Sequence, residues 1–268
     1  MGRLEGKTAL VLGASSPGNM GQHIARRLIA EGAKVMVSGR KSDVLADFAA
    51  EAGCLFHPCD LTKEASVNAL VAAAHDQLGG IDIAVNATGW GLLKPFLDNT
   101  RDELDEMTAL QFIGPFQYYQ ALVRKMARSQ GGRGGSIIQI SSATASIMFH
   151  DHAAYMGTKA GTDHVIRVVA NEFGHEGIRA NSISPGVTET PMTTDAQAVP
   201  GLMDAFVKGY PLGRYGTSDD IAAACVFLAD DECFMTGENL QVNGGLTLRR
   251  NPRPEEIEAS IAAAMGAN

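Results

Sequence analysis

The stretch 8-TALVLGASSPGNMGQHIARRLIAEG-32 decides the fold, because an apolar run passes through a glycine-rich turn directly into a helical pattern. Residues 8–13 have the β-branched character of a buried strand, and apolar residues in 21–32 recur at helical spacing. Gly13, Gly18 and Gly21 let the backbone approach a pyrophosphate, which the free N–H groups at a helix N-terminus favour. The stretch therefore predicts a nucleotide-binding strand, turn and helix, with a plain connecting loop as the alternative.

The same alternation of strand and helix continues along the chain. Further strand-like runs are 34-KVMVSG-39, 81-IDIAVNA-87, 136-SIIQISS-142, 178-IRANSIS-184 and 239-NLQVNGG-245. Helical patterns lie between them, at 42–53, 63–79, 101–129 and 153–174. Because strands that alternate with helices form a parallel sheet covered on both faces, we predict a single-domain, doubly wound, Rossmann-like α/β fold of about seven strands over residues 1–268.

Two segments depart from this rhythm and leave 5–246 as the core. Residues 188–216 carry three prolines between strand-like and helix-like stretches. This composition predicts a small insertion that forms a lid over the carboxyl edge of the sheet. The tail, 247–268, is expected to form a short helix from Pro254, with Ile257 and Ile261 on one packing face.

Composition narrows the classes of function. The chain has 22 basic and 30 acidic side chains, and its net charge of -8 weighs against a sequence-independent nucleic-acid surface. No apolar run is long enough to span a bilayer and no secretory h-region is found, so we expect a cytoplasmic protein without a membrane partner. The cysteines have no C-x-x-C spacing and no accompanying histidine cluster, so we expect buried free thiols and no metal site at Cys54, Cys59, Cys225 and Cys233.

Tyr155 and Lys159, in 153-AAYMGTKAGTDHVIRVVANEF-173, are the strongest chemical signal. One turn of helix would set the phenol beside the ammonium. A nearby cation favours the phenolate and would lower the pKa of the tyrosine from about 10 toward neutrality, where proton transfer is efficient. The spacing alone also fits a solvated pair on a helix surface, so its context decides the interpretation.

The end of the second strand-like run indicates which dinucleotide binds. An acidic side chain at this point of a dinucleotide fold accepts hydrogen bonds from the ribose hydroxyls, but Arg40 and Lys41 stand here instead. They would meet a 2′-phosphate, which favours NADP(H) over NAD(H), whereas a solvated basic pair is the alternative. Asp60 could hydrogen-bond the adenine amine, and the small residues of 86-NATG-89 can lie close to the cofactor.

Taken in order, these motifs resemble those of the short-chain dehydrogenase/reductase family. The resemblance covers residues 5–246 and also rests on Ser142, Thr190, 178-IRANSISPG-186 and 236-TGENLQVNGG-245. It implies a hydride transfer between a nicotinamide and a carbonyl or secondary alcohol.

The resemblance also implies roles for individual residues. Tyr155 would be the general acid and base, and Lys159 would lower its pKa and hold the nicotinamide ribose. Ser142 would donate a hydrogen bond to the substrate oxygen. Gln111 stands where the family has an asparagine that supports a proton relay, and we expect it to keep the relay with shifted geometry. The predicted cofactor-binding residues are Gly13, Ser15, Ser16, Gly18, Met20, Gly21, Arg40, Lys41, Asp60, Leu61, Asn86, Ala87, Thr88, Gly89, Tyr155, Lys159, Pro185, Gly186, Val187, Thr188, Thr190 and Met192.

The residues expected around the substrate are mostly apolar, which favours an apolar ketone or alcohol. Lys94 and Arg214 are the only basic residues near these segments, so a small hydroxy acid is disfavoured. The apolar residues of 202–210 could instead seat the lid. His150 and His152 flank the expected pocket and could contact a substrate oxygen, with merely solvated loop histidines as the alternative. The predicted substrate-binding residues are Trp90, Ser142, Phe149, His150, Tyr155, Met192, Leu202 and Phe206.

Assembly and alternative functions complete the expectations. The apolar segments 112–123 and 221–229 fit the interfaces through which the family forms tetramers or dimers, so we expect a homotetramer, with a homodimer as the alternative. The lengthened glycine loop suggests an enoyl reductase, although its relatives space Tyr and Lys seven apart. The altered loop and Gln111 would also fit a cofactor-binding regulatory protein without turnover.

Overall fold

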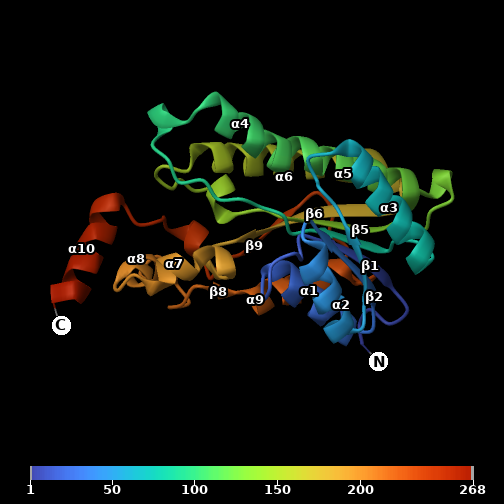
Figure 1. The fold of residues 1–268 in the computed structure, drawn as a ribbon, viewed down its shortest axis with the longest axis horizontal. Helices are drawn as coiled ribbons and strands as arrows, with labels where there is room; N and C mark the ends of the chain where they lie inside the picture. The colour runs from blue at the N-terminus through green and yellow to red at the C-terminus, as the bar shows by residue number, and fades with distance from the viewer. Residues whose placement is uncertain (1, 267–268) are drawn as a thin grey trace.

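A seven-stranded parallel sheet lies at the centre of the molecule, with helices on both faces (Figure 1). The structure, a computed structural model, describes residues 2–266, so the ends of the predicted 1–268 domain and of the 247–268 tail lie outside the described residues. The strand order is β3-β2-β1-β4-β5-β6-β9, the doubly wound α/β fold predicted above. The bounds in chain order are β1 (Thr8–Leu12), α1 (Met20–Ala30), β2 (Lys34–Gly39), α2 (Ser42–Ala52), β3 (Leu55–Pro58), α3 (Glu64–Leu78), β4 (Ile83–Asn86), α4 (Arg101–Thr108), α5 (Gly114–Met126), β5 (Gly135–Ile140), α6 (Ala153–Phe173), β6 (Ile178–Pro185), β7 (Thr188–Glu189), α7 (Thr194–Ala198), α8 (Leu202–Val207), β8 (Gly216–Thr217), α9 (Ser218–Ala229), β9 (Asn239–Val242) and α10 (Pro254–Gly266).

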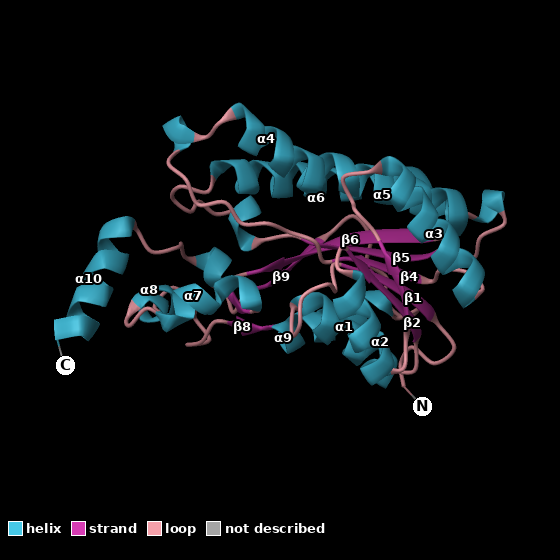
Figure 2. Ribbon diagram, in the orientation of Figure 1, coloured by secondary structure: helices cyan, strands magenta, loops and turns pink. Residues whose placement is uncertain are grey.

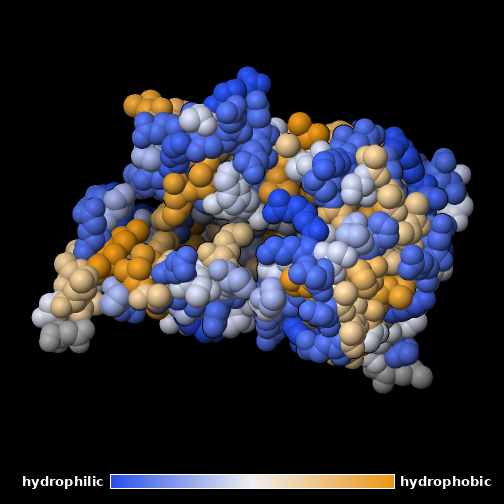
Figure 3. Space-filling view, in the orientation of Figure 1, coloured by the Kyte–Doolittle hydropathy of each residue, from blue (hydrophilic) through white to orange (hydrophobic). Residues whose placement is uncertain are grey.

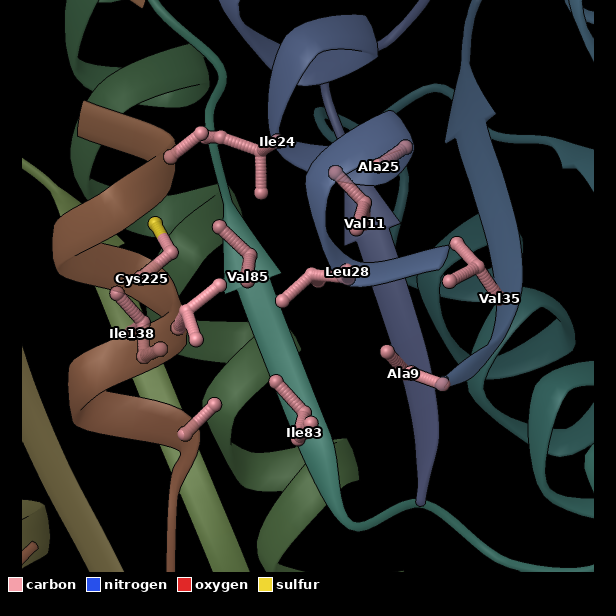
Figure 4. Close-up of a cluster of buried hydrophobic side chains, with 14 of the residues drawn as sticks. Ala9, Val11, Ile24, Ala25, Leu28, Val35, Ile83, Val85, Ile138 and Cys225 are labelled. Carbon is pink, nitrogen blue, oxygen red and sulfur yellow. The ribbon is translucent and has the colours of Figure 1, made fainter. Parts of the chain in front are cut away.

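Alternate residues of each central strand point into two separate hydrophobic cores. Ala9 and Val11 of β1 point to the face covered by α1, α2 and α9, while Leu10 and Leu12 point to the face covered by α3, α5 and α6. Figure 4 shows the first core, in which Leu28 and other helix residues lie over the strands. This period of two means that both faces of each central strand are apolar, as a buried parallel sheet requires.

The turn between β1 and α1 is built to keep the helix N-terminus open. Asn19 caps α1 by accepting a hydrogen bond from the Gln22 amide, and it donates a second bond to the Gly13 carbonyl at 2.8 Å. Gly21 is required here because a Cβ would overlap the Gly13 carbonyl oxygen. Within residues 2–266, the amides of Met20 and Gly21 have no hydrogen-bond partner. The first turn of α1 therefore presents free N–H groups to the predicted phosphate site.

Two elements differ from the sequence-based expectation. The predicted helix over 101–129 is divided by a π-helical segment at Ala109–Ile113, where the Thr162 hydroxyl donates to the Gln111 carbonyl at 2.6 Å. This contact takes a carbonyl out of the regular helical ladder. The seventh strand of the sheet, β3, was not among the six strand-like runs predicted from the sequence. Leu55–Pro58 is a short edge strand with an exposed phenylalanine, so it lacks the apolar run of a buried strand.

The insertion and the tail form one unit beside the sheet (Figure 2). β7 pairs with β8, and α8 packs against α10, which begins at Pro254 as predicted. Ile257 of α10 lies against the core of the lid, and the Ser260 hydroxyl donates to the Gly201 carbonyl at 2.7 Å. The apolar face of the tail is therefore a packing surface.

Three findings on membrane spans, metal ligands and cysteines concern residues 2–266 only. No helix there combines the length and hydrophobicity that crossing a bilayer requires. No group of three or more potential metal ligands is present in this part of the chain. Its four cysteines are free thiols, of which Cys54 is half-buried and the others are buried.

Candidate functional site

The predicted chemical residues gather at the carboxyl edge of the central strands. β4 ends at Asn86 and β5 at Ile140, while α6 carries Tyr155 and Lys159 past both ends. Figure 3 shows the surface hollowed between the layer of α4 and the unit of α7, α8 and α10. In a doubly wound sheet, ligands bind at the carboxyl ends of the strands.

Lys159 is anchored by the ends of two strands. Its ammonium donates to the Ile140 carbonyl at 2.9 Å and to the Thr88 carbonyl at 3.3 Å. The side chain is buried, and burial lowers the pKa of Lys159 to about 8, against an opposing effect of Asp163. The Lys159 side chain is thus both buried and held in one position.

Tyr155 lies one helical turn before Lys159, with the ammonium 5.6 Å from its ring centroid. Burial raises the pKa of Tyr155 to about 12, while the neighbouring Ser142 hydroxyl acts in the opposite direction. The net direction is opposite to the lowering expected from Lys159, because removing the phenolate from water outweighs the bond with Ser142, and the charge of Asp163 also raises the pKa of Tyr155. At neutral pH the phenol is therefore protonated and can donate a proton.

Ser142 stands just beyond β5 at the start of a short helical turn. Its hydroxyl lies 2.9 Å from the Thr144 hydroxyl and accepts a bond from the Thr144 amide at 3.2 Å. The Ser184 hydroxyl donates to the Ser142 carbonyl at 3.1 Å. Since both its hydroxyl and its backbone are held, Ser142 has a defined position beside Tyr155.

Gln111 is buried next to Lys159 but makes no hydrogen bond with it within the described residues. Its amide oxygen accepts from the Trp90 amide at 3.3 Å, and its amide nitrogen donates to the Thr158 hydroxyl at 3.3 Å. A Cβ at Gly89 would lie 3.5 Å from that oxygen and 3.6 Å from the lysine nitrogen. The two side chains border the same small space, and the relay stays a prediction.

The glycine turn and the end of β2 come together at the predicted adenosine site. The Arg40 amide donates to the Ser15 hydroxyl at 3.2 Å, and Ser15 packs against Gly39. The side chains of Arg40 and Lys41 are exposed, and no carboxylate within residues 2–266 pairs with either of them. Free helix amides beside unpaired basic side chains fit the phosphates of a dinucleotide.

Asp60 is ionised but already partly engaged. The Thr62 hydroxyl and amide donate to one carboxylate oxygen at 2.7 and 3.1 Å, and Lys63 lies 3.3 Å from the other. The bond from the Thr62 hydroxyl is the largest cause of the lowered pKa of Asp60. The turn at Asp60 therefore offers a cofactor its backbone groups more than a free carboxylate.

Two predicted cofactor residues have their polar groups occupied by the protein. The Asn86 amide donates to Gln139 at 2.9 Å and its oxygen accepts from the Thr88 amide and hydroxyl, so Asn86 supports the turn 86–89. The Val187 amide donates to the Tyr210 hydroxyl at 2.6 Å, and the Gly216 amide donates to the Val187 carbonyl. Nearby, Thr190 and the exposed Met192 lie just beyond this stretch.

The predicted substrate residues divide into two groups. Phe206 and Leu202 pack with Tyr210 and Leu246 in a small core, so they seat the lid on the body of the protein. Trp90 is half-buried beside Gln111, and the Met192 sulfur would lie 3.7 Å from a Cβ on Gly91. Met192 therefore lies close to the loop that carries Trp90.

The two loop histidines have different surroundings. His150 is exposed, whereas the ring of His152 stacks on Tyr155 with centroids 4.3 Å apart. The sequence indicated both histidines as candidates to contact a substrate oxygen, but only His150 was included among the predicted substrate-binding residues. The position of His152 three residues before Tyr155, on the same side of the first helical turn, is the signal that favours it.

Asp163 is a residue that the sequence-based reasoning missed. It follows Lys159 by one helical turn, and its carboxylate accepts from the Ser141 hydroxyl and from the Asn239 amide, each at 2.7 Å. Burial raises the pKa of Asp163, and its charge in turn raises the pKa of Lys159. Tyr155, Lys159 and Asp163 thus form one line along α6.

The sequence and the fold both match known proteins. A family model described as Enoyl-(Acyl carrier protein) reductase matches residues 13–247. The D-threitol dehydrogenase of Mycolicibacterium smegmatis is 35% identical over 253 residues, which make up 92% of this chain and 95% of that protein. The mitochondrial borneol dehydrogenase of Lavandula x intermedia is 33% identical over 249 residues, 92% of each chain. A short-chain type dehydrogenase/reductase from Mycobacterium ulcerans superposes with a TM-score of 0.89 at 29% identity, covering 98% of this chain and 96% of that one.

Proposed function

We propose, because this chain belongs to the short-chain dehydrogenase/reductase family, that it transfers hydride between bound NADP(H) and an apolar ketone or secondary alcohol. The observation that carries the proposal is the pair of Tyr155 and Lys159 beside Ser142 at the strand ends. When bound, the nicotinamide supplies or accepts the hydride. In reduction the carbonyl carbon gains that hydride with its two electrons, and the carbonyl oxygen gains the proton of the Tyr155 hydroxyl. The Tyr155 phenolate that remains then takes up another proton from solvent.

The protonation states support this direction of proton transfer. Since the pKa of Tyr155 is raised to about 12, the phenol holds its proton until negative charge develops on the substrate oxygen. Lys159, with a pKa of about 8, is charged at neutral pH and stabilises the phenolate that forms. Ser142 donates a hydrogen bond to the same substrate oxygen and orients it.

NADP(H) is proposed over NAD(H) because of the charge at the end of β2. Arg40 and Lys41 directly follow this strand, Asp43 comes only in the first turn of α2, and Asp60 is occupied by Thr62 and Lys63. A guanidinium can make a forked contact with a 2′-phosphate, whereas an acidic residue would repel it.

An apolar substrate is proposed because the nearby cations are neutralised. Lys94 pairs with Glu103 at 2.7 Å, and Arg214 pairs with Asp220 at 2.7 Å, so neither is available to a substrate carboxylate. The relatives are named for threitol and for borneol, so their names do not select one substrate. The spacing of Tyr155 and Lys159 does not support an enoyl reductase, although the matching family model carries that description.

A homotetramer in the cytoplasm is the proposed state of the protein, with a homodimer as the alternative. A groove of about 490 Å³ runs between α5 and α6, and Phe116, Val123, Val168 and Phe173 are among the residues that line it. This apolar surface supports self-association of α5 and α6.

The test is oxidation of NADPH and of NADH by the purified protein with a panel of cyclic and aromatic ketones. The proposal predicts turnover with at least one ketone and a preference for NADPH. Tight binding of NADPH without turnover of any ketone, or of the matching alcohols in reverse, would instead support the regulatory alternative, which Gln111 and the altered glycine loop motivate.

A further inference from the structure

A second hydrogen-bonding side chain stands directly beside the proposed acid. The imidazole of His152, the last residue before α6, is stacked on the Tyr155 ring at 4.3 Å between centroids and 28° between planes. The same imidazole also meets the Phe149 ring in an edge-on arrangement at 5.9 Å, and Phe149 in turn lies 5.6 Å from Phe206 of the lid. These two aromatic neighbours therefore hold the imidazole in one orientation.

The contacts of His152 determine which of its nitrogens carries hydrogen. The nitrogen Nδ1 lies 2.9 Å from the Leu92 carbonyl oxygen. Because a carbonyl oxygen can only accept, Nδ1 is the donor. Burial lowers the pKa of His152, so the ring is neutral at neutral pH. In a neutral imidazole with hydrogen on Nδ1, the nitrogen Nε2 is an acceptor.

The acceptor Nε2 is free and accessible. Within residues 2–266 it has no hydrogen-bond partner, and it is not one of the fully buried polar atoms that lack a partner. The adjacent Cε1 would lie 3.8 Å from a Cβ on Gly91, so the ring faces the loop that borders the hollow. A molecule whose oxygen reaches Tyr155 therefore finds a hydrogen-bond acceptor next to it.

We infer that His152 Nε2 accepts a hydrogen bond from a hydroxyl group adjacent to the reacting carbon, so the substrate class is α-hydroxy ketones and vicinal diols. This inference rests on the proposed function, because Tyr155 must bind the reacting oxygen. The apolar residues around the hollow contact the carbon skeleton, and His152 selects the hydroxyl. A substrate analogue without the hydroxyl leaves Nε2 of His152 unpaired. Loss of this hydrogen bond discriminates between substrates more strongly than a change in apolar contact.

The test compares matched pairs of ketones with NADPH: hydroxycyclohexanone with cyclohexanone, acetoin with butanone, and benzoin with deoxybenzoin. For the wild type, kcat/KM should be about tenfold to a hundredfold higher for the hydroxy member of the pair that fits the hollow. His152→Phe keeps an aromatic ring between Tyr155 and Phe149 but removes the acceptor. The ratio of kcat/KM between the hydroxy ketone and the plain ketone should fall to about one, because only the hydroxy ketone loses a hydrogen bond.

Two further variants separate hydrogen bonding from structural damage. His152→Gln places an amide oxygen near the position of Nε2 and should retain part of the preference. His175→Phe, at an exposed histidine beyond the other end of α6, should leave both members of each pair unchanged. Thermal unfolding and NADPH binding of each variant show that the protein is folded.

Different failures have different meanings. Equal kcat/KM for both members of each pair in the wild type, or an equal loss for both in His152→Phe and His152→Gln, would overturn this inference while the proposed function stands. No turnover of any ketone would overturn the proposed function, and the inference with it.

Discussion

The Lys159 nitrogen lies 5.6 Å from the centre of the Tyr155 ring, and the Ile140 and Thr88 carbonyls hold it there. A solvated pair on a helix surface would have no such anchors, because its side chains would move freely in water. The two carbonyls come from the ends of β5 and from the turn after β4, so the sheet itself sets the position of the ammonium. This relationship makes Lys159 part of the site.

Replacing Lys159 by methionine should therefore reduce kcat by at least about a hundredfold, since the phenolate would lose its stabilising charge. Steady-state kinetics with a ketone substrate would measure the loss. The matched control is Lys125→Met, at an exposed lysine of α5, which should retain kcat. A Lys159→Met enzyme with the kcat of the wild type would show that the ammonium has no part in the reaction.

The rate of ketone reduction should depend on pH through Lys159 before it depends on Tyr155. The pKa of Lys159 is lowered to about 8 and that of Tyr155 is raised to about 12. As pH rises through 8, the lysine loses its charge while the phenol keeps its proton, so kcat/KM should fall above that pH. A profile of kcat/KM that stays flat up to about pH 10 would contradict this assignment.

Asp163→Asn tests whether the carboxylate tunes the lysine. Removing its charge removes an effect that raises the pKa of Lys159, so the fall in kcat/KM should begin at lower pH. At pH 6 the variant should keep kcat within about threefold, because the amide can still bond Ser141 and Asn239. The control is Asp76→Asn, at an exposed residue of α3. An unshifted profile would mean that Asp163 is only a structural residue.

Arg40→Asp should reverse the preference between the two dinucleotides. The variant loses a charge-assisted contact with the 2′-phosphate and gains a like charge, so the KM for NADPH should rise at least about tenfold while that for NADH changes little. Arg101→Asp, at an exposed arginine of α4, is the matched control and should leave both values unchanged. Equal changes for NADPH and NADH in Arg40→Asp would place the phosphate elsewhere.

Local patterns in the sequence predict much of this fold and site. The run from β1 through the glycine turn into α1 has a strong period at each step, and Tyr155 and Lys159 are neighbours by helical geometry alone. Features that depend on residues far apart in the chain were either not predicted or left open. The π-helical segment at Gln111 depends on Thr162 and was not predicted. The seating of Phe206 depends on Leu246, and the sequence left it as one of two alternatives.

The same limit explains why Asp163 was missed and why the role of His152 was left open. The Leu92 carbonyl and the Phe149 ring orient the His152 side chain. Asp163 becomes significant because Ser141 and Asn239, from the ends of other strands, meet it. A histidine or an aspartate in a sequence does not specify such partners.

The central claim is that Tyr155 transfers the proton, and single-turnover oxidation of bound NADPH by Tyr155→Phe tests it most directly. Phenylalanine keeps the ring that stacks on His152 and removes only the hydroxyl. The variant should bind NADPH as the wild type does and oxidise it at least about a hundredfold more slowly in the presence of a ketone substrate. Oxidation at the wild-type rate would contradict the account, because another group would then supply the proton.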